Sequence, residues 1–263
     1  LALVAMVSVV GTSFKKTFSS TLDSSLGADF FIDTGGRGDW GFSPQLVDEI
    51  SEIDGIETVA GFRGGAGVSQ VNVYGSSKDV IGTQEAGLGR VIDITLVEGS
   101  YSGLSNDGLL VHTDPATDLG LSVGDVVPVT FPASGPQDLT VVGIFDDGSL
   151  LGNWVIDMST YESGFDPARQ SDLFAAVEID DDVNIDEVRS DLEAVASSYP
   201  EANLQDRTEY QENIEGRIDT LLLTVNALVG FAVIIAVLGI VNTLMLSVFE
   251  RTREIGLLRA VGM

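Results

Sequence analysis

The sequence has no cysteine and only one histidine, His112, among its 263 residues. Without cysteine it carries no information about disulfide bonds or redox compartment. One histidine is too few for a histidine-rich metal site, and its place in an apolar strand favours a packing or surface role over a catalytic one. The phosphate-binding pattern G-x-x-x-x-G-K-[ST] is also absent, so the chain does not cradle ATP phosphates itself. We therefore expect no catalytic residue, no metal and no cofactor.

Basic residues are also scarce, at 13 Lys and Arg against 40 Asp and Glu. Residues 1–14 and 220–249 are uncharged, and residues 250–263 hold two acids and three bases. Residues 15–219 therefore hold 38 acids and 10 bases, a net charge of −28. Such a surface repels nucleic-acid phosphates and disfavours docking on anionic lipid headgroups, so we expect no nucleic-acid partner.

The two uncharged stretches are the candidates for contact with a membrane. Residues 220–249 form a run of 30 residues without a charge. A bilayer core needs about 20 apolar residues in a helix, so this run predicts a transmembrane helix. Residues 1–14 are too short to span and lack the basic start and cleavage site of a signal peptide. We expect them to be the end of a truncated first transmembrane helix, which would make the chain a fragment at both ends.

The region between these stretches alternates between strand-like and helix-like patterns. Runs with apolar alternation, bounded by Gly, Pro and Asp turns, predict strands. These runs are 28–34, 56–62, 67–75, 107–112, 125–131, 138–145, 153–158 and 173–179. Residues 75–106 are rich in Gly and Ser and give no clear pattern. The alternation predicts an α+β class, with a mixed-sheet domain between two transmembrane helices.

Two segments of this region have the pattern of amphipathic helices. Residues 43–53 have Ser43 at the expected N-cap and a proline at the first helical position. Residues 184–199 place Asn184 and Glu187 at capping-box spacing. In both segments the apolar residues recur at helical spacing, which predicts one buried face.

A third helical pattern runs from about residue 208 to residue 249. Thr208 and Gln211 fit a capping box at its start, and between there and the uncharged stretch only Gly216 interrupts the helix-forming residues. We expect one helix whose first part, 208–219, is a stalk and whose second part, 220–249, is the transmembrane helix.

Two short motifs have weak functional meaning. Asp180, Asp182 and Asn184 have the spacing of the first calcium ligands in a calcium-binding loop, but Ile185 stands where such a loop needs glycine. A solvated strand-to-helix turn that ends in an N-cap explains this segment more simply. The tripeptide Arg-Gly-Asp at 37–39 is too short to carry a functional assignment.

The C-terminal stretch "NTLMLSVFERTREIGLLRAVGM", residues 242–263, is the specific signal. It resembles the signature that follows the second transmembrane helix in the FtsX-like, MacB-type permeases of ATP-binding-cassette transporters. The "LGADFFI" stretch near the start is similar to the beginning of the extracytoplasmic core domain of that family. The motif match lies almost entirely in residues 242–263, although the architecture of the whole chain agrees with the family.

The resemblance implies a fold and a mechanism. Family members have four transmembrane helices, with a large domain between the first and the second, so helices three and four would be absent here. Their ATPase is a separate chain or domain, they usually act as dimers, and they relay ATP-driven motion to the outer domain, which is called mechanotransmission. The implied location is the plasma membrane, as a multi-pass protein with an extracytoplasmic core domain.

The resemblance also implies domain limits and a partner-binding segment. The expected limits are 1–14 for the end of transmembrane helix 1, 15–207 for the MacB-like core domain, 208–219 for the stalk, 220–249 for transmembrane helix 2 and 250–263 for a truncated cytoplasmic coupling segment. The residues expected to bind the ATPase are Glu250, Arg251, Arg253, Glu254, Ile255, Gly256, Leu257, Leu258 and Arg259. We expect residues 250–262 to form a short separate helix across the membrane edge.

Two alternatives stay open at this point. The amphipathic segment 250–263 could lie on the lipid headgroups, as juxtamembrane helices commonly do, instead of in an ATPase groove. The whole chain could also be a membrane-anchored regulator or sensor of a cell-envelope process. The basic residues on either side of the spans do not fix the orientation, because Lys15 and Lys16 follow the first stretch on the expected outer side. An envelope hydrolase is disfavoured because no nucleophile–base pair or metal cluster can be assembled from the sequence.

Overall fold

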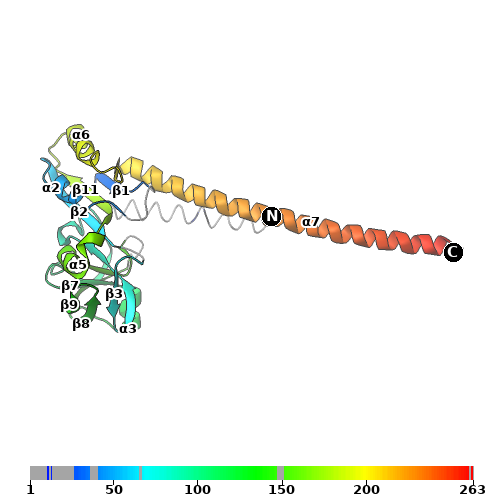
Figure 1. Cartoon of the computed structure of the whole chain (residues 1–263), viewed down its shortest axis with the longest axis horizontal. Helices are drawn as coiled ribbons and strands as arrows, with labels where there is room; N and C mark the ends of the chain where they lie inside the picture. Colours follow the sequence, from blue (N-terminus) through cyan, green and yellow to red (C-terminus); the bar gives the residue numbers. More distant parts are fainter. Residues whose placement is uncertain are drawn as a thin grey trace. The chain divides into compact units, whose positions relative to one another are not determined.

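The computed structural model describes residues 11, 13, 27–35, 41–64, 67–146, 151–260 and 262 (Figure 1). The Arg-Gly-Asp motif and most of residues 1–14 lie outside the described residues. The chain divides into two compact units. One is Thr21–Gln211, and the other combines Leu1–Ser20 with Glu212–Met263.

The unit Thr21–Gln211 is built on a single mixed sheet. Its strands are β1 (Phe30–Asp33), β2 (Ile56–Arg63), β3 (Gln70–Val73), β4 (Ser76–Asp79), β5 (Ile81–Thr83), β6 (Leu96–Gly99), β7 (Gly108–His112), β8 (Val126–Phe131), β9 (Gly135–Phe145), β10 (Trp154–Asp157), β11 (Asp172–Ile179) and β12 (Asn203–Asp206). Their order is β12-β1-β11-β2-β5-β10-β7-β9-β8-β3-β4, and β6 pairs with β9. The pairs β5–β10 and β7–β9 are parallel and the others are antiparallel, so the predicted α+β class with a mixed sheet is confirmed.

Helices connect and cover these strands. They are α2 (Gln45–Ser51), α3 (Thr113–Leu119), α5 (Met158–Gly164), α6 (Ile185–Ala196) and α7 (Arg207–Ala260), with short 3-10 turns η1 (Glu85–Gly87) and η2 (Pro167–Arg169). Helices α2 and α6 lie over the part of the sheet that contains β1, β2 and β11 (Figure 1). The predicted apolar faces are the buried ones, with Leu46 and Ile50 on α2 and Val188 and Leu192 on α6.

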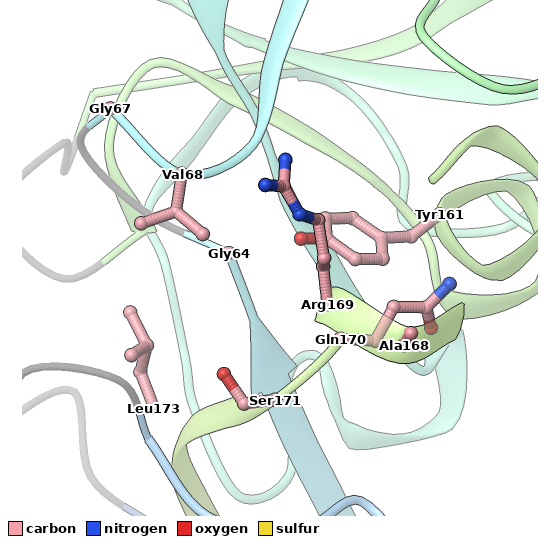
Figure 2. A pocket seen from close by; sticks show the side chains of 9 residues that line it. All are labelled: Gly64, Gly67, Val68, Tyr161, Ala168, Arg169, Gln170, Ser171 and Leu173. Carbon is pink, nitrogen blue, oxygen red and sulfur yellow. The ribbon is translucent and has the colours of Figure 1, made fainter. Parts of the chain in front are cut away.

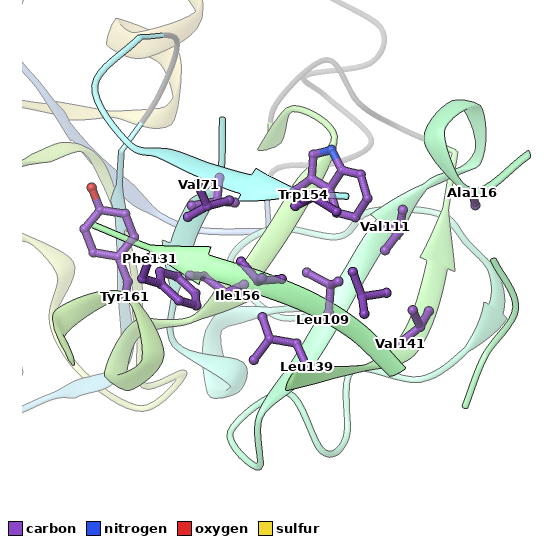
Figure 3. Packing of buried hydrophobic residues seen from close by; sticks show 14 of the residues in the cluster. Val71, Leu109, Val111, Ala116, Phe131, Leu139, Val141, Trp154, Ile156 and Tyr161 are labelled. Atoms are coloured by element: carbon purple, nitrogen blue, oxygen red, sulfur yellow. The ribbon is translucent and has the colours of Figure 1, made fainter. Parts of the chain in front are cut away.

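A second hydrophobic core lies among β3 and β7 to β10. Figure 3 shows Leu109, Val111, Leu139 and Val141 packed beside Trp154 in this core. Strand β8 contributes every second residue, because side chains alternate between the two faces of a strand. The sheet therefore carries two separate cores, and β2 and β5 stand between their strands in the strand order.

The N-terminal signals of the helices were predicted with mixed success. Asn184 caps α6, and its side chain accepts a 3.1 Å hydrogen bond from the Asp186 N–H, as predicted. Ser43 Oγ accepts a 3.4 Å hydrogen bond from the Gln45 N–H beside Pro44, which already has helical dihedrals. The cap predicted at Thr208 is wrong, because α7 begins at Arg207 and Thr208 lies inside its first turn.

Two short helices were not predicted. Helices α3 and α5 have the sequences TDPATDL and MSTYESG, which contain too few large apolar residues for a helical period to stand out. Each begins with a side-chain cap. His112 Nδ1 accepts from the Asp114 N–H at 3.2 Å, and Asp157 Oδ1 accepts from the Ser159 N–H at 3.0 Å. The single histidine is therefore a helix cap, and this agrees with the packing or surface role expected for it.

Helix α7 is one continuous helix of 54 residues. The predicted continuity from the stalk into the apolar segment is confirmed, because no break interrupts the helix between residues 208 and 249. Among the described residues it is the one helix long and apolar enough to cross a membrane. In the same unit, a Cβ added to Gly11 would lie 2.5 Å from Leu222 Cδ2, so the backbone at Gly11 packs directly on α7.

Candidate functional site

The first turn of α7 is fixed by a capping box that the sequence reading missed. Asp206 Oδ1 accepts a 2.9 Å hydrogen bond from the Glu209 N–H, and Glu209 Oε2 accepts one of 2.9 Å from the Asp206 N–H. The Glu209 N–H, followed by the neighbouring Arg189, lowers the pKa of Asp206 below its usual range. The D-x-x-E spacing of these residues was the available signal, and it competed with the T-x-x-Q spacing that starts two residues further on.

Arg189 on α6 binds the same turn. Its Nη1 donates to Asp206 Oδ2 at 2.8 Å, and its Nη2 donates to Glu209 Oε1 at 2.9 Å. Its Nε also donates to Glu193 Oε1, one turn further along α6, at 3.0 Å. The carboxylates, Glu209 first, raise the pKa of Arg189 above its ordinary value. One guanidinium therefore connects α6, the end of β12 and the start of α7.

Tyr210 fixes the start of α7 through apolar contacts. Its residue surface is 9% exposed, and its ring stacks on Phe31 with centroids 4.7 Å apart. The Phe174 ring lies 5.6 Å from the same tyrosine. Because aromatic pairs at these distances favour a defined geometry, the tyrosine holds the helix start against β1 and β11. We name Arg189, Asp206, Glu209 and Tyr210 the helix junction, and all four belong to the unit Thr21–Gln211.

The predicted coupling segment is the last part of α7. Glu250 to Arg259 are helical and exposed in this single chain. The apolar side chains Ile255, Leu257 and Leu258 are 57%, 60% and 53% exposed. The expectation of a separate short helix is wrong, because no proline or glycine pair breaks the ladder after Phe249 and α7 continues to Ala260. Val261, which would extend the apolar side, lies outside the described residues.

A buried ion pair links the end of β2 to the start of β11. Arg63 Nε donates to Asp172 Oδ1 at 2.7 Å, and the Arg63 Nη1 donates to Gln170 Oε1 at 2.8 Å and to Glu162 Oε1 at 3.2 Å. Burial raises the pKa of Asp172, although its contact with Arg63 opposes the shift. The pair joins residues 109 positions apart in sequence, and no local pattern could have indicated it.

No metal centre was found in the part of the chain that the structure describes. No group of three Asp, Glu or His side chains there is arranged to hold an ion. Asn184, the third residue of the calcium-like spacing, is occupied as the cap of α6. The segment is the strand-to-helix turn that the simpler interpretation expected.

These features define a class of protein, a mixed-sheet domain joined by one continuous helix to an apolar segment with a charged end. The family model of the MacB-like periplasmic core domain matches residues 1–195, and that of the FtsX-like permease C-terminal domain matches residues 226–263. The chain therefore belongs to the MacB/FtsX-type permeases of ABC transporters, a family of membrane permease components with a periplasmic domain. No curated protein matches the chain.

Several solved structures are similar to this chain. The periplasmic region of MacB from Actinobacillus actinomycetemcomitans is 15% identical with a TM-score of 0.51, and the match covers 75% of this chain and 95% of that one. A domain of a putative permease protein from Porphyromonas gingivalis matches at 17% identity and a TM-score of 0.42, over 68% of this chain and 88% of that one. The extracellular domain of the noncanonic ABC-type transporter YknZ from Gram-positive bacteria matches at 10% identity and a TM-score of 0.42, over 68% of this chain and 98% of that one.

Proposed function

We propose that this chain relays the ATP-driven motion of a separate ABC-type ATPase to its own extracytoplasmic domain, for export or for work on the cell envelope. The observation that carries the proposal is the continuity of α7 from the helix junction to Arg259. A continuous helix transmits displacement along its axis because each residue is tied to the next turn by a backbone hydrogen bond. The ATPase, and not this chain, would hydrolyse ATP.

The two ends of α7 suit this task in different ways. At the helix junction, Arg189 and Tyr210 tie the first turn to the sheet domain by polar and apolar contacts. At the other end, Ile255, Leu257 and Leu258 expose apolar surface among charged residues. We propose that residues 250–263 seat on the ATPase, through Glu250, Arg251, Arg253, Glu254 and Arg259 as well as the apolar side chains.

Family membership supports three further proposals. We propose a multi-pass protein of the plasma membrane, with residues 15–207 as the extracytoplasmic core domain, 208–219 as the stalk and 220–249 as the span. We also propose that the permease acts as a homodimer or with a paired permease, in contact with lipid along α7. The net charge of residues 15–219 gives no reason to expect a nucleic-acid partner.

The coupling role predicts different effects for two variants of α7. Leu258→Asp places a charge on the side of the helix that Ile255 and Leu258 share. A leucine buried there on the ATPase would contribute about 1.5–3 kcal/mol. Arg253→Ala removes one exposed ionic contact, which contributes about 0–1 kcal/mol. We expect Leu258→Asp to reduce the stimulation of the partner ATPase by the permease far more than Arg253→Ala does.

The measurement is ATPase stimulation with co-purification of the two subunits. Thr252→Asp, at an exposed position of α7 that is not among the residues proposed to bind the ATPase, is the matched control for an added charge. Full stimulation and normal co-purification with Leu258→Asp would show that this side does not bind the ATPase and rests on lipid instead.

A further inference from the structure

A hollow of about 450 Å³ opens beside Gln170, which accepts a hydrogen bond from Arg63. In Figure 2, Arg169 and Tyr161 form one side of it, and Val68 and Leu173 lie across from them. These residues come from α5, η2, the start of β11 and the loop that precedes β3. The volume lies within the range of roughly 300–1,000 Å³ that small-molecule sites occupy.

Hydrogen bonds of Gln170 hold the polar side of the hollow in place. Gln170 Nε2 donates to the Glu162 and Phe165 carbonyl oxygens, each at 3.0 Å, and Gln170 Oε1 accepts from Arg63. Arg63 is itself bonded to Asp172, which is fully buried. The chain next to Arg169 is therefore fixed on its Gln170 side before any ligand arrives, which lowers the entropy that binding would cost.

Arg169 differs from other arginines of this unit. Arg63, Arg90 and Arg189 all form ion pairs with carboxylates. Arg169 forms no ion pair with any of the residues that the structure describes, although residues 15–219 hold 38 acids. Its guanidinium thus stands at the wall of a hollow with its fork of donors available to a planar anion.

Two other donors near the hollow are already used. The Gly67 N–H donates to Asp79 Oδ1 at 2.8 Å, and Arg63 is committed to the Asp172 pair. One guanidinium matches one negative charge, whereas a phosphate dianion would be left partly uncompensated. Val68, which is 47% exposed, and Leu173 present apolar surface that a small inorganic anion could not use.

We propose that this hollow binds a small amphipathic monocarboxylate, with its carboxylate on Arg169 and its apolar body between Val68, Leu173 and Tyr161. The negative charge of the domain does not prevent this, because repulsion from distant acids is screened over about 8–10 Å at physiological salt. The bidentate contact with Arg169 acts at hydrogen-bond distance, where salt screens the attraction much less than it screens the repulsion from distant acids. The site goes beyond the proposed coupling function and does not depend on it.

The test uses the full chain in lipid nanodiscs and 3-phenylpropionate as the probe, with empty nanodiscs to subtract partition into lipid. Titration calorimetry should detect saturable binding. Arg169→Gln should weaken binding at least about tenfold, as loss of a charge-assisted hydrogen-bonded pair implies. Val68→Asp, which sets a carboxylate against the ligand at an exposed position, should also weaken it. Arg90→Gln changes the net charge equally at an exposed ion pair with Glu178, near the other end of β11 from Leu173, and should leave affinity unchanged within about twofold.

The uncharged 3-phenylpropanamide separates the two parts of the proposal. It should bind at least about tenfold more weakly than the carboxylate, because it cannot pair with Arg169 as an ion. Absence of saturable binding, equal affinity in Arg169→Gln, or equal affinity for the amide would each overturn the proposal. No ATPase is present in this experiment, so none of these results bears on the coupling function.

Discussion

Arg63 and Asp172 are the residues whose pairing is most costly to disturb. Both are almost fully buried, and Asp172 Oδ2 has no hydrogen-bond partner in the structure, so Arg63 supplies the main compensation for this carboxylate. Removing one member of such a pair leaves a buried charge, and the loss commonly reaches about 3–5 kcal/mol. The pair stands at one end of the ladder between β2 and β11, where Arg63 and Asp172 are register partners.

We predict that Arg63→Met lowers the free energy of unfolding by about 3–5 kcal/mol at neutral pH. Burial already raises the pKa of Asp172, and loss of Arg63 would raise it further. An acid with a raised pKa in the folded state binds protons more tightly when folded, so stability falls as pH rises through the window above its usual value of about 4. The deficit of Arg63→Met should therefore shrink as the pH is lowered.

Urea unfolding of the full chain at several pH values checks this prediction. The double variant Arg63→Met, Asp172→Asn should recover part of the loss at neutral pH, because it no longer buries a charge. Arg90→Met, at an exposed ion pair with Glu178, is the control and should change stability little. A deficit that is the same at all pH values would mean that Asp172 stays ionised without Arg63.

The residues also differ in how far the sequence could predict them. Asn184 was identified because a capping residue and its helix are neighbours in the chain. Arg63 and Asp172 meet only because β2 and β11 pair, and nothing local reports this pairing. The contact of Tyr210 could not be predicted for the same reason, because its partner Phe31 comes from the opposite end of the domain in sequence. The exposed Glu250–Arg259 segment was found through family resemblance, and its role remains a prediction.

At the scale of elements, the period of the apolar residues decided what could be predicted. Strand β8 alternates buried and exposed residues without exception, and its bounds were predicted within a residue. Strand β9 begins at Gly135, earlier than expected, because the hairpin with β8 continues through a segment read as a turn. The Gly- and Ser-rich region 75–106 contains β4, β5 and β6, whose three or four residues are too few to establish a pattern.

Helix α7 gives a prediction at this scale, because its continuity is the basis of the coupling proposal. An added Cβ at Gly216 would have no atom within 4 Å, so Gly216→Ala should fit and favour the helix by about 1 kcal/mol. Gly216→Pro removes a backbone hydrogen bond, clashes with the Glu212 carbonyl and costs about 3 kcal/mol or more. We expect Gly216→Pro to bend α7 and to reduce the transport or envelope function, while Gly216→Ala preserves it.

The readout at this position separates binding from transmission. Co-purification with the ATPase should be unchanged in both variants, because residue 216 is far along the helix from residues 250–259. Complementation of a deletion strain reports the function. Full complementation by Gly216→Pro, with a bend shown by spin-label distances across residue 216, would mean that rigidity of the stalk is not required.

At the scale of the whole molecule, net charge distinguishes a strongly acidic region of the sequence from an uncharged one. Residues 15–219 carry a net charge of −28, while residues 220–249 carry none. Transferring so many charges into a bilayer is prohibitively unfavourable, so we expect the acidic block to lie on one side of the membrane. The sequence predicted this division from composition alone, whereas the order of strands in the sheet required the long-range pairings of the folded chain.

The last prediction concerns which side that is, since the basic residues do not decide it. The chain has no cysteine, so a single introduced cysteine reports its own position without background labelling. Ser122 is exposed between α3 and β8, and Thr252 is exposed in the last part of α7. If residues 15–207 are extracytoplasmic, a membrane-impermeant maleimide added to intact spheroplasts should label Ser122→Cys and leave Thr252→Cys unlabelled. Permeabilised spheroplasts should label both, which controls for reactivity. Labelling of Thr252→Cys but not Ser122→Cys in intact spheroplasts would reverse the orientation and remove the cytoplasmic ATPase from reach of residues 250–259.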